Sequence, residues 1–422
     1  MRKILIIIGA FLATLFVSAQ QQPWTLQQCV DTALINNRNI KQKELSRQVN
    51  EIAYQQARYN LLPNLSGSAS QSWSFGRSQI SDGTYQNLNV SNTSFGLSSG
   101  ITLFDGLRMK YNIDARMAEL KISEAGLEKI REDIILSVST AFLQVLLNKE
   151  LLQNSIDQLK LTESRIEQQK SLVLHGRLAE GEIYELQAQQ SKEELNRTQA
   201  ENALKLSLLD LAQILELPDY EQLDIVVPTD LMSNELELLN AEAVYKSALM
   251  RRPEVKSAEY QLRSSEKNVQ IAKSAYFPTL SLGANVGGGY YNSVSTPLST
   301  SIGFNLSVPI FNKMGTRSQV QTAQLNAESS RLNVDNTKLE LKKTIQQAYF
   351  NAVAANAKWT SAKKSEVASS EAYRFATQKY EGGKSTVYEL YQAKNNLSQA
   401  QSQVIQSKYE YVFRLKILEL MK

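Results

Sequence analysis

Residues 65–75 read Leu-Ser-Gly-Ser-Ala-Ser-Gln-Ser-Trp-Ser-Phe, a run in which serine occupies every second position. A period of two residues places the serines on one face of a β-strand and the other side chains on the opposite face. No charged residue interrupts the pattern. The stretch therefore predicts a strand with one polar face and one mostly apolar face.

The same alternation recurs in residues 93–103, 280–286 and 302–310, where apolar residues alternate with serine, glycine, threonine or asparagine. Each predicted strand has about ten residues, which is the length that crosses a bilayer when the strand is tilted. Aromatic residues stand near both strand ends, as in the two girdles of a membrane barrel. They are Trp73, Phe75, Tyr290 and Tyr291 at one end, and Phe104 and Phe311 at the other. The alternative is a soluble antiparallel sheet with one wet face.

Strands in lipid must form a closed barrel, because an open edge would leave backbone N–H and C=O groups without partners. The four predicted strands are too few to close alone, so membrane strands require several copies of the chain. Two copies would give eight strands, whose interior is normally filled by side chains. Three copies would give twelve strands around a wet lumen, which suits inward-facing serine, glycine and asparagine. The strands thus predict a homotrimer in contact with membrane lipid.

The chain is an internal duplication, because residues 24–217 recur with drift in residues 240–420. Ala33 aligns with Ala248 at an offset of 215 (248 − 33), and Ile214 with Ile417 at an offset of 203 (417 − 214). A register kept over such a length indicates two structural repeats. Between these matches, residues 183–186 (Ile-Tyr-Glu-Leu) align with residues 387–390 (Val-Tyr-Glu-Leu).

Very long helices follow each strand pair. Residues 107–174 contain no proline, and residues 316–380 contain neither proline nor glycine. At a rise of 1.5 Å per residue, about 65 residues make a helix of roughly 100 Å. Apolar residues at three- and four-residue steps predict packing seams between neighbouring helices. Glycine turns at 175–181 and 381–385 predict that shorter helices then return to Leu217 and Leu420.

These patterns predict a linear order of segments. The expected order is a signal peptide at 1–19, a helix of the first repeat at 20–62, an outer-membrane strand pair at 63–105, a helical hairpin at 106–217, a linker at 218–239, a helix of the second repeat at 240–277, a second strand pair at 278–313 and a second hairpin at 314–422. The signal peptide is inferred from Arg2 and Lys3, an apolar run over 4–17 and the small-x-small ending Val17-Ser18-Ala19. The protein is therefore expected to be exported.

Composition argues against several function classes. The formal charge of +4 falls to about +2 (4 − 2) without Arg2 and Lys3, which is too low to indicate nucleic-acid binding. The single cysteine and single histidine provide no disulfide framework, zinc site or Cys/His catalytic pair. Cys29 is interpreted as a small apolar residue on a helix face, and Glu180 and Glu182 as solvated charges on a turn. We expect no cofactor, no metal and no enzyme activity; a secreted hydrolase is the weakest alternative.

Two motifs resemble TolC-type outer membrane efflux proteins. Residues 24–37, WTLQQCVDTALINN, resemble the opening signature of that family, and Thr25 with Gln28 also forms a predicted capping box. Residues 380–390, YEGGKSTVYEL, are similar to its second tip motif, Tyr-x-x-Gly-x-x-Ser/Thr-aliphatic-x-acid-aliphatic. Combined with the duplication, the resemblance extends over the whole chain after the signal peptide.

The resemblance implies a membrane α+β fold in which a trimeric twelve-stranded barrel continues as a helical periplasmic tunnel. It implies a passive exit duct that receives substrates from a periplasmic adaptor and an inner-membrane pump. It assigns Glu389 to a pore constriction, where Gln392 replaces a second acid found in some members, and Tyr380 to a gate latch. The remaining predicted sites are the adaptor-docking tips, at Gly176, Arg177, Gly181, Gly382, Gly383 and Lys384. A barrel with an adhesive or scaffolding role and no transport is the alternative function.

Overall fold

The computed structural model describes residues 23–79, 83–175, 179–220, 223–227, 240–292 and 294–422. They form two compact units. Unit 1 contains the chain up to Lys41 with residues 130–248 and 342–422, and unit 2 contains residues 42–129 and 249–341. The predicted signal peptide, Gly176, Arg177 and most of the predicted linker lie outside the described residues. Within the described residues, no helix combines the length and the apolarity needed to cross a bilayer.

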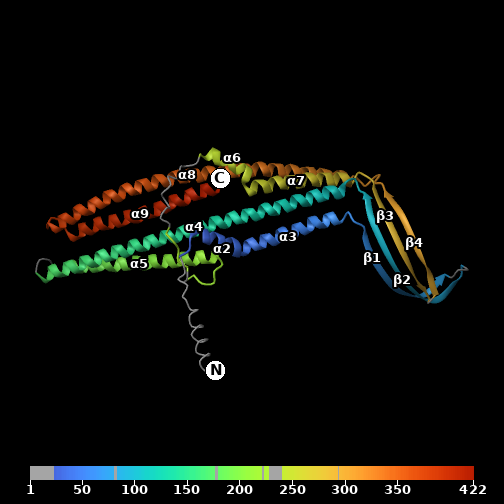
Figure 1. Ribbon diagram of the computed structural model, residues 1–422, viewed down its shortest axis with the longest axis horizontal. Helices are drawn as coiled ribbons and strands as arrows, with labels where there is room; N and C mark the ends of the chain where they lie inside the picture. Colours follow the sequence, from blue (N-terminus) through green and yellow to red (C-terminus); the bar gives the residue numbers. More distant parts are fainter. Residues whose placement is uncertain (1–22, 80–82, 176–178, 221–222, 228–239, 293) are drawn as a thin grey trace, which may run out of the picture. The chain divides into compact units, whose positions relative to one another are not determined.

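Unit 2 contains one antiparallel sheet of four strands in the order β1-β2-β3-β4 (Figure 1). The strands are β1 (Asn64–Gln79), β2 (Tyr85–Phe104), β3 (Thr279–Tyr291) and β4 (Val294–Ser307). The central β2–β3 pair joins the first repeat to the second. Consequently β1 and β4 form the two edges of the sheet.

The strands are longer than predicted, with 16, 20, 13 and 14 residues instead of about ten. Pairing of β1 with β2 continues to Gln79 and Tyr85, past the alternating segment that marked these strands in the sequence. The prediction for β4 was wrong at its end, because the strand ends at Ser307 while the alternation continues to Ile310. Pro309 explains the difference, since it has no N–H to donate to a ladder.

Hydrogen bonds confirm the two-faced pattern of β1 and β2. Ser66 and Ser70 pair through their hydroxyls with Ser98 and Ser94, each at 2.7 Å, so the predicted serine face is formed. On the other face Gln71 donates to the Ser91 hydroxyl at 2.9 Å. The register therefore places the alternating serines of β1 on one face and Trp73, Phe75, Phe95 and Leu97 on the other.

The predicted long helices are present as α4 (Arg108–Leu174) and α8 (Gly315–Glu381), each of 67 residues. The helices α3 (Arg38–Tyr59) and α7 (Pro253–Ser274) precede β1 and β3 (Figure 1). Within unit 2, Lys267 of α7 donates to Asp114 of α4 at 2.8 Å, and Ser265 of α7 pairs with Ser330 of α8 at 2.9 Å. Helix α7 thus links the long helices of the two repeats.

Unit 1 contains α2 (Leu26–Asn36), α5 (Gly181–Ile214) and α9 (Val387–Leu420), together with most of α6 (Ala241–Arg251). Helix α5 runs beside the second half of α4, and α9 beside the second half of α8 (Figure 1). The predicted capping box of Thr25 with Gln28 is confirmed at the start of α2. Cys29 is fully buried, and burial raises the pKa of its thiol to about 11, which fits the predicted apolar role.

Candidate functional site

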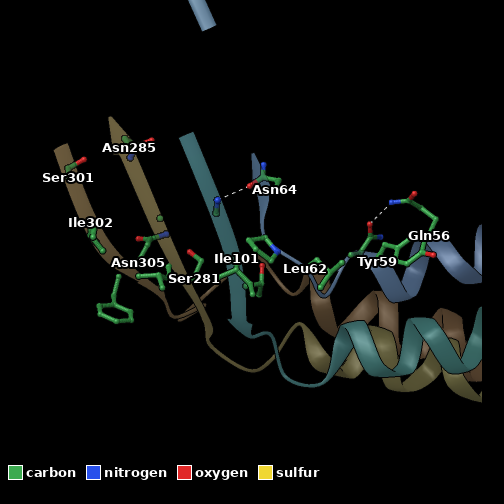
Figure 2. A pocket seen from close by; sticks show the side chains of 18 residues that line it. Gln56, Tyr59, Leu62, Asn64, Ile101, Ser281, Asn285, Ser301, Ile302 and Asn305 are labelled. Carbon is green, nitrogen blue, oxygen red and sulfur yellow. Dashed lines mark hydrogen bonds between the residues drawn. The ribbon is translucent and has the colours of Figure 1, made fainter. Parts of the chain in front are cut away.

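The polar face of the sheet is concave near the end of α3 and encloses a hollow of about 850 Å³. Figure 2 shows Asn285, Ser281, Ser301 and Asn305 on β3 and β4 along this region. Asn64 helps to hold the wall of this hollow in place, because its side chain accepts a hydrogen bond from the Gly100 N–H at 2.7 Å. None of the lining residues is charged. The surface therefore offers hydroxyl and amide groups that suit water and solutes of either charge.

A second cluster lies in unit 1, at the end of the long helices. The Tyr380 hydroxyl donates to the Glu182 carboxylate at 2.6 Å and accepts from the Gln169 amide at 3.0 Å. Burial, together with the hydrogen bond to Glu182, raises the pKa of the Tyr380 phenol to about 12. The phenol therefore keeps its proton at physiological pH and can act as the donor. These bonds connect the end of α8 with α4 and α5, and hence the two repeats.

The interpretation of Glu182 as a solvated turn charge was wrong, because its carboxylate is the acceptor for Tyr380. Gln169 was also missed, although it is a buried polar residue near the end of α4. The sequence signal for Glu182 was its position in the first turn of α5, where a carboxylate is favoured by the helix dipole. Its tyrosine partner lies 198 residues away, so the sequence did not reveal the contact.

Glu389 and Gln392 lie on one face of α9, beside small residues of α8. They line a groove of about 450 Å³ together with Ser365, Ala368, Ser369, Ala372, Tyr388, Ala393 and Asn396. Both side chains are exposed, and the Thr386 hydroxyl accepts from the Glu389 N–H at 3.3 Å to cap the helix. Among the other predicted tip residues, Gly181, Gly382, Gly383 and Lys384 are exposed at the turns.

A buried ion pair lies on the opposite face of α9. Lys394 donates to Glu193 of α5 at 2.9 Å and also contacts the Thr162 hydroxyl of α4, while Thr162 donates to the second oxygen of Glu193. All three side chains are almost completely buried. Burial lowers the pKa of the Lys394 ammonium, and the Glu193 carboxylate opposes this shift. The pair fixes the rotational setting of α9, and thereby the face that carries Glu389.

The ion pair was not identified from the sequence. Lys394 and Glu193 are separated by 201 residues, and each belongs to a charged, glutamine-rich helix in which the other lysines and glutamates are exposed or half-buried. The sequence did contain one signal, which is that polar residues recur on a single face of α4. Thr162 and Gln169 are seven residues apart on α4, two helical turns, so the ion pair and the Tyr380 cluster use the same face of α4.

The profile of a family described as outer membrane efflux protein matches the chain twice, over residues 29–215 and 244–420. The chain belongs to the outer membrane efflux protein family. The two matches fall on the two predicted repeats. Toxin and drug export protein A of Aggregatibacter actinomycetemcomitans is 24% identical over 404 residues, which cover 92% of this chain and 83% of the relative. The solvent efflux pump outer membrane protein SrpC of Pseudomonas putida is 28% identical over 321 residues, 72% of this chain and 64% of the relative.

A solved structure shows the same fold. The CmeC outer membrane channel of Campylobacter jejuni superposes with a TM-score of 0.80 at 20% sequence identity, covering 94% of this chain and 85% of that one. Membership of the outer membrane efflux protein family makes the protein an outer-membrane exit duct with a periplasmic extension, which decides between transport and the adhesive alternative. Its family is described as one of efflux proteins. Among the described residues, no group of three histidine, cysteine or acidic side chains is placed to hold a metal ion.

Proposed function

We propose that three copies of this efflux protein form a twelve-stranded barrel, which carries substrates passively across the outer membrane. The observation that supports this assembly is the sheet order, because β1 and β4 have no neighbour on their outer side within the described residues. Lipid cannot satisfy the N–H and C=O groups of such edges, whereas pairing of β1 with β4 of another copy does. The uncharged polar face of the sheet then lines the lumen.

Apolar stripes on the helices support the same assembly. On α3 the exposed apolar residues include Leu45, Val49 and Ile52, at helical spacing, and in the unit 2 part of α8 they include Leu325, Leu332 and Leu339, spaced by seven. A seven-residue period is the pattern of helices that pack along their length. In a trimer these stripes become seams between neighbouring copies.

Light scattering of the purified protein in detergent tests the assembly. We expect a protein mass of three chains after subtraction of the detergent. A mass of one or two chains would contradict the twelve-stranded barrel, because neither four nor eight strands around this polar face would enclose a wet lumen.

We further propose that Glu389 forms an acidic ring at a constriction of the tunnel, with Gln392 one turn further on. Its support is the exposure of the Glu389 carboxylate and the anchoring of α9 by the buried ion pair on the opposite face. Three carboxylates in one ring would favour cations. The uncharged barrel face would contribute little selectivity.

Replacing Glu389 with alanine or glutamine should remove most of the preference for cations, while conductance changes less. Reversal potentials in bilayers under a salt gradient measure this preference. Glu185→Gln is the matched control, because Glu185 occupies the aligned position in the first repeat and is also exposed. Unchanged selectivity in both Glu389 variants, or its loss in the Glu185 variant, would contradict the proposed ring.

Tyr380 is proposed to latch the closed state through its bonds to Glu182 and Gln169. Tyr380→Phe removes a hydrogen bond to a carboxylate, worth about 1.5–3 kcal/mol. We expect a higher open probability in single-channel recordings and increased sensitivity of cells to large antibiotics. Tyr184→Phe is the control, because this exposed tyrosine of α5 has no hydroxyl hydrogen bond in the described structure. Equal behaviour of the two variants would argue against a latch.

The exposed turns at Gly181 and at Gly382, Gly383 and Lys384 are proposed to dock a periplasmic adaptor, which connects the duct to an inner-membrane pump. Gly176 and Arg177 are proposed to belong to the same surface. The support is the family membership together with the exposed position of Gly181, Gly382, Gly383 and Lys384 at helix ends, where a partner can reach the backbone.

A further inference from the structure

The turn between β4 and α8 encloses a second hollow in unit 2, of about 290 Å³. Its lining includes Tyr276, Ile310, Phe311, Met314 and Arg317. The hollow therefore combines an apolar wall with one guanidinium group. Neither the polar face of the sheet nor the helix tips share any of these residues.

The apolar residues of this turn are unusually exposed. Ile310 is 94% and Phe311 74% exposed, and Tyr276 and Met314 are more than half exposed. Clustered exposed apolar side chains indicate a surface that is covered in the cell. The turn begins directly after the end of β4 that faces α8, on the helix side of the sheet. In an outer-membrane protein with periplasmic helices, this is the level of the inner-leaflet headgroups.

The charge of the turn differs from that of its counterpart in the first repeat. There Asp105 accepts from the Met109 N–H at 3.1 Å and lies 3.5 Å from Arg108, so the cation has an acidic partner. Alignment of Phe104 with Phe311 places Asn312 at the position of Asp105. Asn312 is neutral and bonds to the Thr316 hydroxyl. Lys313 and Arg317 consequently have no acidic partner within the described residues.

The backbone at position 313 adopts a conformation that suits glycine better than lysine. Lys313 and Met314 adopt φ angles of 53° and 63°, in the left-handed region that costs residues other than glycine. The first repeat places Gly106, with φ 68°, at the corresponding step. Glycine can therefore replace lysine at position 313 without added backbone strain.

We propose that this hollow binds a phospholipid of the inner leaflet, with Arg317 and Lys313 at the headgroup phosphate and Ile310, Phe311 and Met314 along an acyl chain. The Arg317 guanidinium and the apolar wall match the two ends of such a lipid, and Lys313 in the same turn adds a second cation near the hollow; juxtamembrane cations attract anionic headgroups. The site requires the outer-membrane location of the protein but no particular exported substrate.

A phosphatidylglycerol with a diazirine on its acyl chain tests the proposal. It is added to the full-length protein in detergent and irradiated, and the adducts are mapped by peptide mass spectrometry. We expect adducts within residues 308–317, and a decrease of about fivefold in Arg317→Gln, since each cation near a headgroup contributes an attraction of this order. Arg331→Gln, which changes an exposed arginine further along α8, should label like the native protein.

Lys313→Gly separates binding from folding. Glycine relieves the left-handed strain, so the melting temperature should not fall, while labelling should decrease. Absence of adducts in 308–317, or equal labelling of the Arg317 and Arg331 variants, would overturn the proposal. A photoreactive residue at position 314 that links to a second copy of the chain, and not to lipid, would assign the hollow to the subunit interface and overturn it as well.

Discussion

Lys394→Met should destabilise the helical unit by about 3–5 kcal/mol, because it leaves the Glu193 carboxylate buried without its counter-ion. Methionine has nearly the volume of lysine, so loss of packing contributes little. The Thr162 hydroxyl and the Gln189 amide, which donates to Glu193 at 2.9 Å, remain as neutral donors and cannot replace the ammonium. The loss should be measured as the free energy of unfolding in denaturant, followed by the helical circular dichroism signal.

Two comparisons isolate the buried charge as the cause. The double variant Lys394→Met with Glu193→Leu should recover most of the stability, since replacing both members of a buried pair by apolar residues is often neutral or stabilising. Lys205→Met breaks the exposed pair with Glu201 on α5, which lies at 3.0 Å, and should change the free energy of unfolding far less than Lys394→Met, because water solvates both charges. A Lys394 variant as stable as the Lys205 variant, or a double variant as unstable as the single one, would rule out this account.

The fold could be inferred from the sequence because its signals are local and repeated. The alternation at 65–75 indicates a two-faced strand, and the absence of proline over 107–174 indicates a long helix. The ends of the strands were harder to predict from the sequence. Beyond Phe75 the strand continues through Gly76 and Arg77, which are held by pairing with β2 and not by their own propensity. Only the partner strand determines where such a strand stops.

The sequence singled out candidate residues where one motif contains them and missed contacts where two repeats meet. Glu389 and Tyr380 belong to one eleven-residue motif, residues 380–390. Glu182, Gln169 and Glu193 acquire their roles from contacts with α8 and α9, whose residues are about 200 positions away. Their side-chain types suit a solvated helix surface equally well. Only the packing of the hairpins distinguishes the two situations.

Gly289→Ala should disrupt the centre of the sheet, because a Cβ at this position would overlap the Thr93 carbonyl oxygen of β2 and lie 3.1 Å from the Ser94 Cα. Gly289 follows a register shift between β3 and β4, which brings its backbone unusually close to β2. The contacts are backbone atoms, which cannot rotate away as a side chain would. The β2–β3 ladder must therefore separate locally, and this ladder joins the two repeats.

We expect Gly289→Ala to cost roughly 2–4 kcal/mol, in the range of substitutions that strain the backbone and break hydrogen-bond networks. The cost should be evident as a lower unfolding temperature of the strand signal in detergent and less folded protein in outer-membrane fractions. Gly303→Ala on β4 is the matched control, because a Cβ there would meet no atom within 4 Å. If both alanine variants unfold at the native temperature, β2 and β3 are not as closely apposed as the register requires. If the Gly303 variant alone is impaired, the constraint lies at the β4 edge, where the proposed trimer pairs with its neighbour.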